Sequence, residues 1–298
     1  MTLPLRSKRY SDGWPRGAGI RTRTSRLAVS GHPGRSLASL ALIAGVLGSI
    51  GTAKAEERDP IFFNYEVAVT NLTHGEFAQA GDICRTGQIM GLFAFATHKP
   101  NFRLFELGKP VSGELAILAE SGAPFLLVNA LAADPKVEEA FSVPAAEDFP
   151  AKFLDGVLCP GGILKVTVKA RPGDRLSMAA MVFPTNDAFI ALDGVKLPQT
   201  GGPIEYLSLA YDAGSESNDE LCRNIPGLPD LPGCPAARDE NTDPNKPDPN
   251  TAGGPGIGEG YAHIHSGIHG IGDLPPNLWD WRNPVARITI RRVSRVRP

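Results

Sequence analysis

Hydrophobic and polar residues alternate in several segments of the chain. Alternation with a period of two, together with β-branched and aromatic residues, is typical of a strand that buries one face. The longer segments that predict strands are Tyr65–Leu72, Gln88–Thr97, Ile163–Ala170, Arg175–Phe183, Ile204–Tyr211 and Val285–Val293. Shorter strands are predicted at Phe189–Leu192 and Ala262–His265.

One segment has the features of a helix. Ser112–Ser121 begins with a residue suited to an N-cap, carries an early Glu, and is followed by Gly122. Pro172-Gly173-Asp174 predicts a tight turn between two strands. Many short strands with little helix predict an all-β fold, an antiparallel β-sandwich with one short helix. Alternating βαβ units are absent, so a dinucleotide-binding fold is not expected.

A stretch from about residue 223 to 258 is built from Pro, Asp, Asn and Gly with little apolar periodicity. Such a composition is typical of a long, solvated loop, and we expect disorder at about 235–258. Strands are predicted on both sides of it. It is therefore an insertion in a single domain, residues 56–298, rather than a domain boundary.

The first 55 residues have the pattern of an export signal. A basic leader precedes an apolar run of 14 residues, Leu37–Ile50, and Ala53-Lys54-Ala55 follows as a cleavage site. A transmembrane helix needs roughly 20 apolar residues, so no membrane span is expected after cleavage. We expect a secreted, periplasmic or cell-envelope protein; an uncleaved N-terminal anchor is the alternative.

Charge is distributed unevenly along the chain. The 298 residues carry a net charge of -2, but residues 1–55 hold nine Lys/Arg and one acid. The remainder has 21 bases and 31 acids, a net charge of -10. An acidic domain argues against nucleic acid as a partner, because phosphate binding needs a basic face. The 33 Gly and 27 Pro exclude coiled coils and long helical arrays.

All four cysteines follow the export signal. An even number in an oxidising compartment indicates two disulfides, for which three connectivities can be drawn. We favour Cys222–Cys234, which closes a short loop, with Cys84–Cys159 joining two segments next to strands. A four-cysteine zinc site is the competing interpretation, but the chain has no C-x-x-C spacing.

Acidic residues stand at the ends of separate predicted strands. Asp187 lies in PTNDAF, and Asp212 and Glu216 lie in YDAGSE. Acids from different loops at one end of a sandwich are the oxygen ligands that Ca²⁺ prefers. Ordinary turn-forming and capping acids are the alternative.

Three of the six histidines fall within HIHSGIH: His263, His265 and His269. An H-x-H pair places both imidazoles on one face of a strand, and the third could return from the following turn. Together they would suit Zn²⁺ or another transition metal. A polar strand edge, or histidines bonded to neighbouring carboxylates, is the alternative. No nucleophile motif of the hydrolase, P-loop or H-E-x-x-H type is present.

Several segments, taken in order, resemble the spondin domain, the F-spondin-type module also present in mindin. They run from about Tyr65 to Val293 and read YEVAVTNLT, LFELGKPVSGELAILAESG, RPGDRLSMAAMVFPTNDAFIALDGVKLP, LAYDAGSESNDE and DWRNPVARITI. The resemblance implies an extracellular β-sandwich that binds calcium through loop acids. HIHSGIHG and the Pro-rich insertion are more similar to the exported microbial branch than to the animal adhesion proteins.

By the family pattern, Asp187 matches the acid of a P-[ST]-x-D segment and Asp212 the acid of a DAG segment. A third family Asp falls on Glu216, whose longer side chain changes the geometry. The resemblance thus implies a secreted, calcium-binding and non-catalytic adhesion module. Its expected partner is an extracellular or envelope protein or a glycan. The alternatives are a transition-metal protein or enzyme using the histidines, and a structural envelope protein.

Overall fold

The computed structural model of the protein describes residues 60–75, 84, 86–144, 147, 156–226 and 258–296. All belong to one compact unit, Glu57–Pro298. The predicted signal segment, residues 1–55, and nearly all of the predicted disordered insertion at 235–258 lie outside the described residues. In the part of the chain that is described, no helix has the length and apolarity that a membrane crossing would require.

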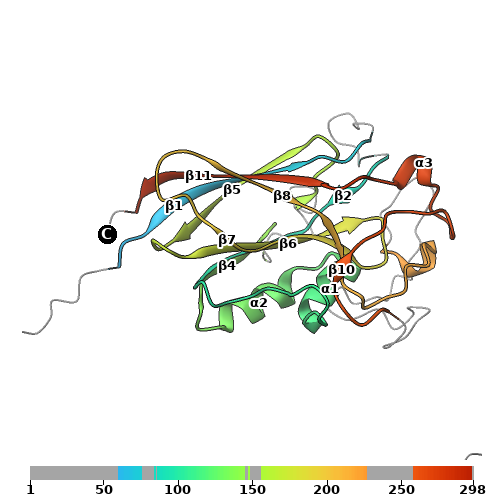
Figure 1. Ribbon diagram of the computed structural model, residues 1–298, viewed down its shortest axis with the longest axis horizontal. Helices are drawn as coiled ribbons and strands as arrows, with labels where there is room; N and C mark the ends of the chain where they lie inside the picture. Colours follow the sequence, from blue (N-terminus) through green and yellow to red (C-terminus); the bar gives the residue numbers. More distant parts are fainter. Residues whose placement is uncertain are drawn as a thin grey trace, which may run out of the picture. The chain divides into compact units, whose positions relative to one another are not determined.

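Two antiparallel sheets form the described unit, as predicted (Figure 1). The first has the order β5 (Ile163–Ala170), β1 (Phe63–Asn71), β11 (Ala286–Arg295) and β8 (Ile204–Ser208). The second has the order β10 (His263–Ile264), β9 (Ala210–Asp212), β7 (Ala188–Lys196), β6 (Arg175–Phe183), β3 (Phe93–His98) and β4 (Val137–Val143). A short strand, β2 (Ile89–Met90), pairs with β6.

The main core lies between the sheets. Alternate residues of β1, namely Tyr65, Val67 and Val69, are buried, as the period-two pattern predicts. Val67 pairs with Ile290, and Val69 with Ile288, so the apolar positions of β11 point into the same core. Removing such side chains from water stabilises the fold by about 25 cal/mol per Å² of apolar surface.

Helices cover the other face of the second sheet (Figure 1). Leu115 and Leu118 of α1 (Gly113–Ser121) and Leu127 of α2 (Phe125–Ala133) pack on small sheet residues such as Ala94 and Ala179. Strands β3 and β6 are therefore buried on both faces. This explains why their sequences are apolar at nearly every position rather than alternating.

Helix α1 begins and ends where its sequence predicts. The Ser112 hydroxyl oxygen accepts a hydrogen bond from the backbone N–H of Leu115 at 3.2 Å. Gly122 adopts a positive φ of 71° and donates its N–H to the carbonyl of Leu118 at 2.9 Å.

The expectation of a single helix is wrong, because α2 and a short α3 (Pro276–Trp279) are also present. Helix α2 has the sequence FLLVNALAA, which is apolar almost all round and lacks a side-chain N-cap. It therefore shows no amphipathic period. Strand β4 was also not predicted; its sequence VEEAFSV is acidic and only half-buried.

Two predicted strands are each divided in the structure. Gln88–Thr97 forms β2 and β3, separated at a cis Gly91–Leu92 peptide. Ile204–Tyr211 forms β8 in the first sheet and part of β9 in the second, so the chain crosses between sheets at Leu209. At the crossing, the Ser208 hydroxyl accepts from the N–H of Ala191 at 3.1 Å.

The predicted Cys84–Cys159 disulfide is present, with 5.7 Å between the Cα atoms. Cys222 is also disulfide-bonded. Its predicted partner, Cys234, lies outside the described residues.

Replacing both Cys84 and Cys159 with Ala is expected to lower the free energy of unfolding by about 4 kcal/mol, because the bridge closes a 75-residue loop in the unfolded chain. Urea unfolding without reductant measures the effect. The exposed Leu207→Ala variant is the control. An unchanged midpoint in the double variant would mean that this bridge does not constrain the unfolded state.

Candidate cation site

Three neighbouring strands bring the predicted acids and histidines together. Asp187 directly precedes β7, and Asp212 is the last residue of β9. Asp212 pairs with Ala188 on one side and with His263 of β10 on the other. The site therefore lies at the β10 edge of the second sheet, where the loops after β6 and β9 meet.

Asp187 is fully buried and has one engaged oxygen. Its Oδ2 accepts hydrogen bonds from the backbone N–H of Ser215 at 2.7 Å, from the Ser215 hydroxyl at 3.1 Å and from the N–H of Glu216 at 3.0 Å. Its Oδ1 is buried and has no hydrogen-bond partner within the described residues. A buried polar oxygen without a partner is costly, which makes this atom the outstanding feature of the site.

Asp212 is also fully buried, but both of its oxygens are engaged. Oδ1 accepts from the N–H of Gly214 at 2.7 Å, and Oδ2 accepts from the Asn218 side-chain amide at 2.6 Å. Two imidazoles approach the same carboxylate. His263 Nδ1 lies 3.7 Å from Oδ1, and His265 Nε2 lies 3.9 Å from Oδ2.

The two carboxylates are held where ionisation is unfavourable. Burial and the neighbouring charge of Asp212 raise the pKa of Asp187 to about 8, despite three hydrogen bonds to its Oδ2. Burial also raises the pKa of Asp212, against the hydrogen bond from Asn218. Among the described residues, no Lys or Arg pairs with either group, and His263 is the basic side chain that lowers the pKa of Asp212.

The remaining acids of the loop have different roles. Glu216 is buried beside Asp187, to which its backbone N–H donates. Asp219 accepts from the side chains of Asn186 and Asn224. The Glu220 carboxylate accepts from the N–H groups of His269 and Ile271 at 2.5 and 2.9 Å. Asp219 and Glu220 therefore hold the loops around the site.

His265 is a support rather than a free ligand. Its Nδ1 accepts from the N–H of Gly267 at 3.0 Å, so Nε2 carries the proton, which it donates to Asn218 Oδ1 at 2.9 Å. Burial lowers the pKa of His265 to about 4, with further lowering by His263 and His269. The neutral imidazole orients Asn218, whose amide in turn holds Asp212.

The three histidines do not point to one place. The His263 side chain is about one-third exposed beside Asp212, whereas His269 Nε2 lies 3.0 Å from the Ser266 hydroxyl. Among the described residues, the group of ligand atoms that all lie within 4.8 Å of one another combines Asp212 and His263 with Glu259; the predicted ligands Asp187 and Glu216 are not in this group. Glu259 was not predicted, and only its position four residues before His263 could have indicated it.

No family model matches the chain, and no curated protein matches it at a significant level. The resemblance to the spondin domain therefore stays a prediction from the sequence. The geometry of the cation site is the basis on which a function is proposed.

The pKa of Asp187 makes the stability of the cation-free protein depend on pH. Native Asp187 stays protonated up to about pH 8, whereas an unfolded Asp releases its proton near pH 4, so the native state binds more protons in between. In EDTA, the free energy of unfolding should fall by about 2 kcal/mol between pH 6.5 and 8. Urea titrations at each pH measure it.

The choice of pH window separates the two acids, whose pKa values are raised, from His265, whose pKa is lowered. His265 has a lowered pKa, so it reduces stability only as the pH falls from about 6.5 toward 4. Above pH 6.5 the acids alone contribute, and Asp187→Asn should flatten the profile. A flat profile already in the unaltered protein would contradict the protonated state of buried Asp187.

Proposed function

We propose that the protein is an exported, non-catalytic binding module of spondin type that holds Ca²⁺ at the loop end of its second sheet. The single observation that carries the proposal is Oδ1 of Asp187, a buried carboxylate oxygen without a described partner, next to the buried Asp212. A cation beside this atom would satisfy the oxygen and neutralise the repulsion between the two acids.

The types of donor atom suit calcium. Asp187 and Asp212 supply carboxylate oxygens, and Glu216 lies buried at the same loop. Calcium takes six to eight oxygen ligands in flexible arrangements, including loop carbonyls. Two buried negative charges match a divalent ion in charge. Asn218 and His265, which hold Asp212 in place, would support its orientation toward the ion as outer-shell partners do.

A binding role, rather than a catalytic one, follows from the resemblance and from the absence of a nucleophile motif in the sequence. The predicted export signal places the module in the envelope or outside the cell. Its partner would be an extracellular or envelope protein or a glycan.

A second candidate is a transition-metal site. Asp212, Glu259 and His263 offer two carboxylates and one imidazole within 4.8 Å, a mixed nitrogen and oxygen set that suits Zn²⁺. This set differs from the three histidines that the sequence suggested and shares Asp212 with the calcium site. A transition-metal ion and a calcium ion would therefore compete for Asp212, unless its carboxylate bridged the two ions.

Metal removal distinguishes the candidates. We expect EDTA to lower the melting temperature and excess Ca²⁺ to restore it by about 5 to 10 °C, because an ion at 100 times its Kd stabilises by about 2.7 kcal/mol. Differential scanning calorimetry measures the shift, and elemental analysis of untagged protein identifies the ion. Asp187→Asn should abolish the response, and the exposed Glu205→Gln should keep it.

The variants Glu259→Gln and His263→Ala test the second candidate. If they leave the calcium response intact, calcium is held by Asp187 and Asp212 as proposed. Stoichiometric zinc that is lost in these variants, together with a melting curve unmoved by calcium, would favour the transition-metal site instead.

A further inference from the structure

The two ends of the sandwich differ in charge. The acids of the cation site lie at the end that carries β10 and α3, whereas β1 begins and β11 finishes at the opposite end (Figure 1). Basic side chains gather at this opposite end, where β5, β7 and β11 finish and β6 begins. We call this group the basic end; its members are Lys169, Arg171, Arg175, Lys196, Arg292 and Arg295.

Most of the charge at the basic end is not balanced by acids. Arg171 pairs with Glu138 at 3.1 Å, but among the described residues none of the other five bases forms an ion pair with a carboxylate. Arg175 and Lys196 lie opposite each other in the register of β6 and β7. Like charges in opposite positions destabilise a sheet, so this arrangement favours a partner that brings negative charge.

Aromatic rings hold three of the bases in place. Lys169 Nζ and Arg171 Cζ lie 5.1 and 5.0 Å from the centroid of the Phe62 ring, and Arg292 Cζ lies 4.6 Å from that of Phe63. A cation over a ring face is attracted to it and keeps its full charge. The positive groups are therefore ordered around the first residues of β1 without being neutralised.

Apolar side chains are exposed among these bases. Ile61 directly precedes the two aromatic residues and is 44% exposed, and Val293 in β11 is 56% exposed. The carbonyl of Phe62 accepts a hydrogen bond from the N–H of Val296 at 2.9 Å, which fixes the chain next to Ile61 against the end of β11. Bases interleaved with aromatic and aliphatic side chains are typical of surfaces that lie at the interface between a lipid bilayer and water.

We propose that the basic end binds the surface of an anionic lipid bilayer. Each Lys or Arg close to such a surface strengthens binding by about fivefold, and Ile61 and Val293 would enter the headgroup region. A soluble polyanion would match the charges but leave both apolar side chains in water. The combination therefore favours a bilayer over a dissolved anion.

The acidic character of the whole domain does not oppose this orientation. Strand β11 has ten residues and spans about 30 Å, whereas charges in physiological salt are screened over about 8 Å. The acids of the cation site are thus too distant to cancel the attraction, and the field of the protein directs the basic end toward the bilayer. The cation site would face away from the lipid, so this inference goes beyond the proposed function and does not depend on calcium.

Co-sedimentation of the full-length protein with lipid vesicles tests the basic end. The probes are vesicles of phosphatidylcholine with about 30% phosphatidylglycerol, and vesicles of phosphatidylcholine alone. We expect binding to the anionic vesicles only, equal in EDTA and in Ca²⁺, and lost at about 1 M salt because charges are then screened within about 3 Å.

Variants locate the binding. The double variant Lys169→Gln with Arg295→Gln should weaken binding to anionic vesicles at least about tenfold. Ile61→Ser should weaken it by about threefold or more, because the apolar contact is lost, while the melting temperature is unchanged at this exposed position.

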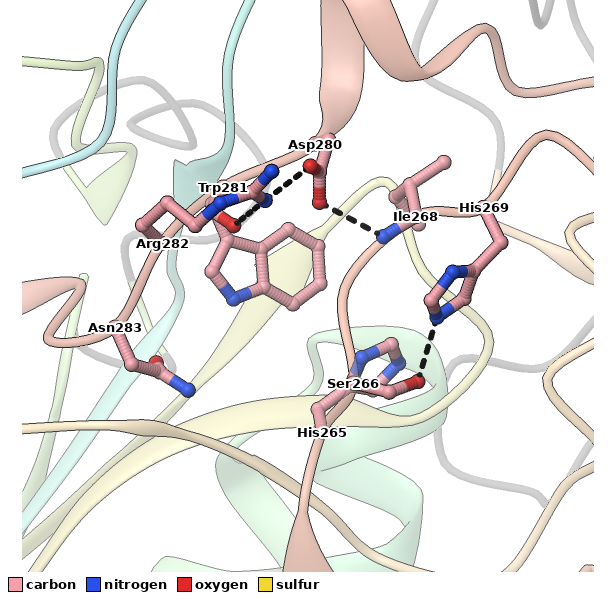
Figure 2. A pocket seen from close by; sticks show the side chains of 8 residues that line it. All are labelled: His265, Ser266, Ile268, His269, Asp280, Trp281, Arg282 and Asn283. Atoms are coloured by element: carbon pink, nitrogen blue, oxygen red, sulfur yellow. Dashed lines mark hydrogen bonds and ion pairs between the residues drawn. The ribbon is translucent and has the colours of Figure 1, made fainter.

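A second double variant removes the same charge elsewhere. Lys165→Gln alters an exposed base nearer the start of β5, and Arg282→Gln alters an exposed base at the other end, where it is paired with Asp280 (Figure 2). This matched control should bind the vesicles as the unaltered protein does.

Absence of binding to the anionic vesicles would overturn the inference, as would equal losses in the two double variants. Polyphosphate in solution is the competing probe: tight polyphosphate binding, with vesicle binding that Ile61→Ser leaves unchanged, would identify a dissolved polyanion instead. Vesicle binding that requires Ca²⁺ and is lost in Asp187→Asn would place the contact at the cation site. Calcium binding without vesicle binding contradicts only the basic end, and vesicle binding without calcium binding contradicts only the cation site.

Discussion

The second sheet is buried on both faces, by the first sheet on one side and by α1 and α2 on the other. This burial restricts where polar and ionisable side chains can lie. Strands covered on both faces have apolar side chains at nearly every position, so polar groups are displaced to strand ends and to the edge. At the β10 edge, three strands end near one another, and Asp187, Asp212 and His263 collect there.

The same burial gives the site its electrostatic character. Asp187 and Asp212 accept hydrogen bonds from backbone N–H groups and neutral side chains, and no Lys or Arg of the described residues pairs with them. Neutral donors orient a carboxylate but do not remove its charge. The burial of two such carboxylates therefore raises the pKa of each, which favours their protonated forms. His265 is likewise neutral, because burial lowers its pKa. Its two ring nitrogens form hydrogen bonds with Gly267 and Asn218.

Local patterns were sufficient for much of the fold. Ile163–Ala170 and Arg175–Phe183 have the predicted bounds, and Ser112 and Gly122 cap the predicted helix. The failures have physical causes. Helix α2 has no apolar period, and the break at Leu209 is set by the packing of two sheets rather than by local preference.

The candidate site was predictable to a similar extent. Strand-end positions correctly indicated that Asp187 and Asp212 would meet. His263 and His265 of the H-x-H pair lie near one carboxylate. The spacing could not reveal that Nδ1 of His265 accepts a hydrogen bond from the N–H of Gly267. Glu259 depends on the register of β10 against β9, a long-range property that no short motif encodes.

The crossing at Leu209 has a mechanical meaning. Strand β8 belongs to one sheet and β9 to the other, so Asp212 stands only four residues from a strand of the opposite layer. Ser208 anchors the turn to Ala191 of β7. Because the chain passes from one sheet to the other just before β9, a displacement of one sheet relative to the other would be felt directly at Asp212.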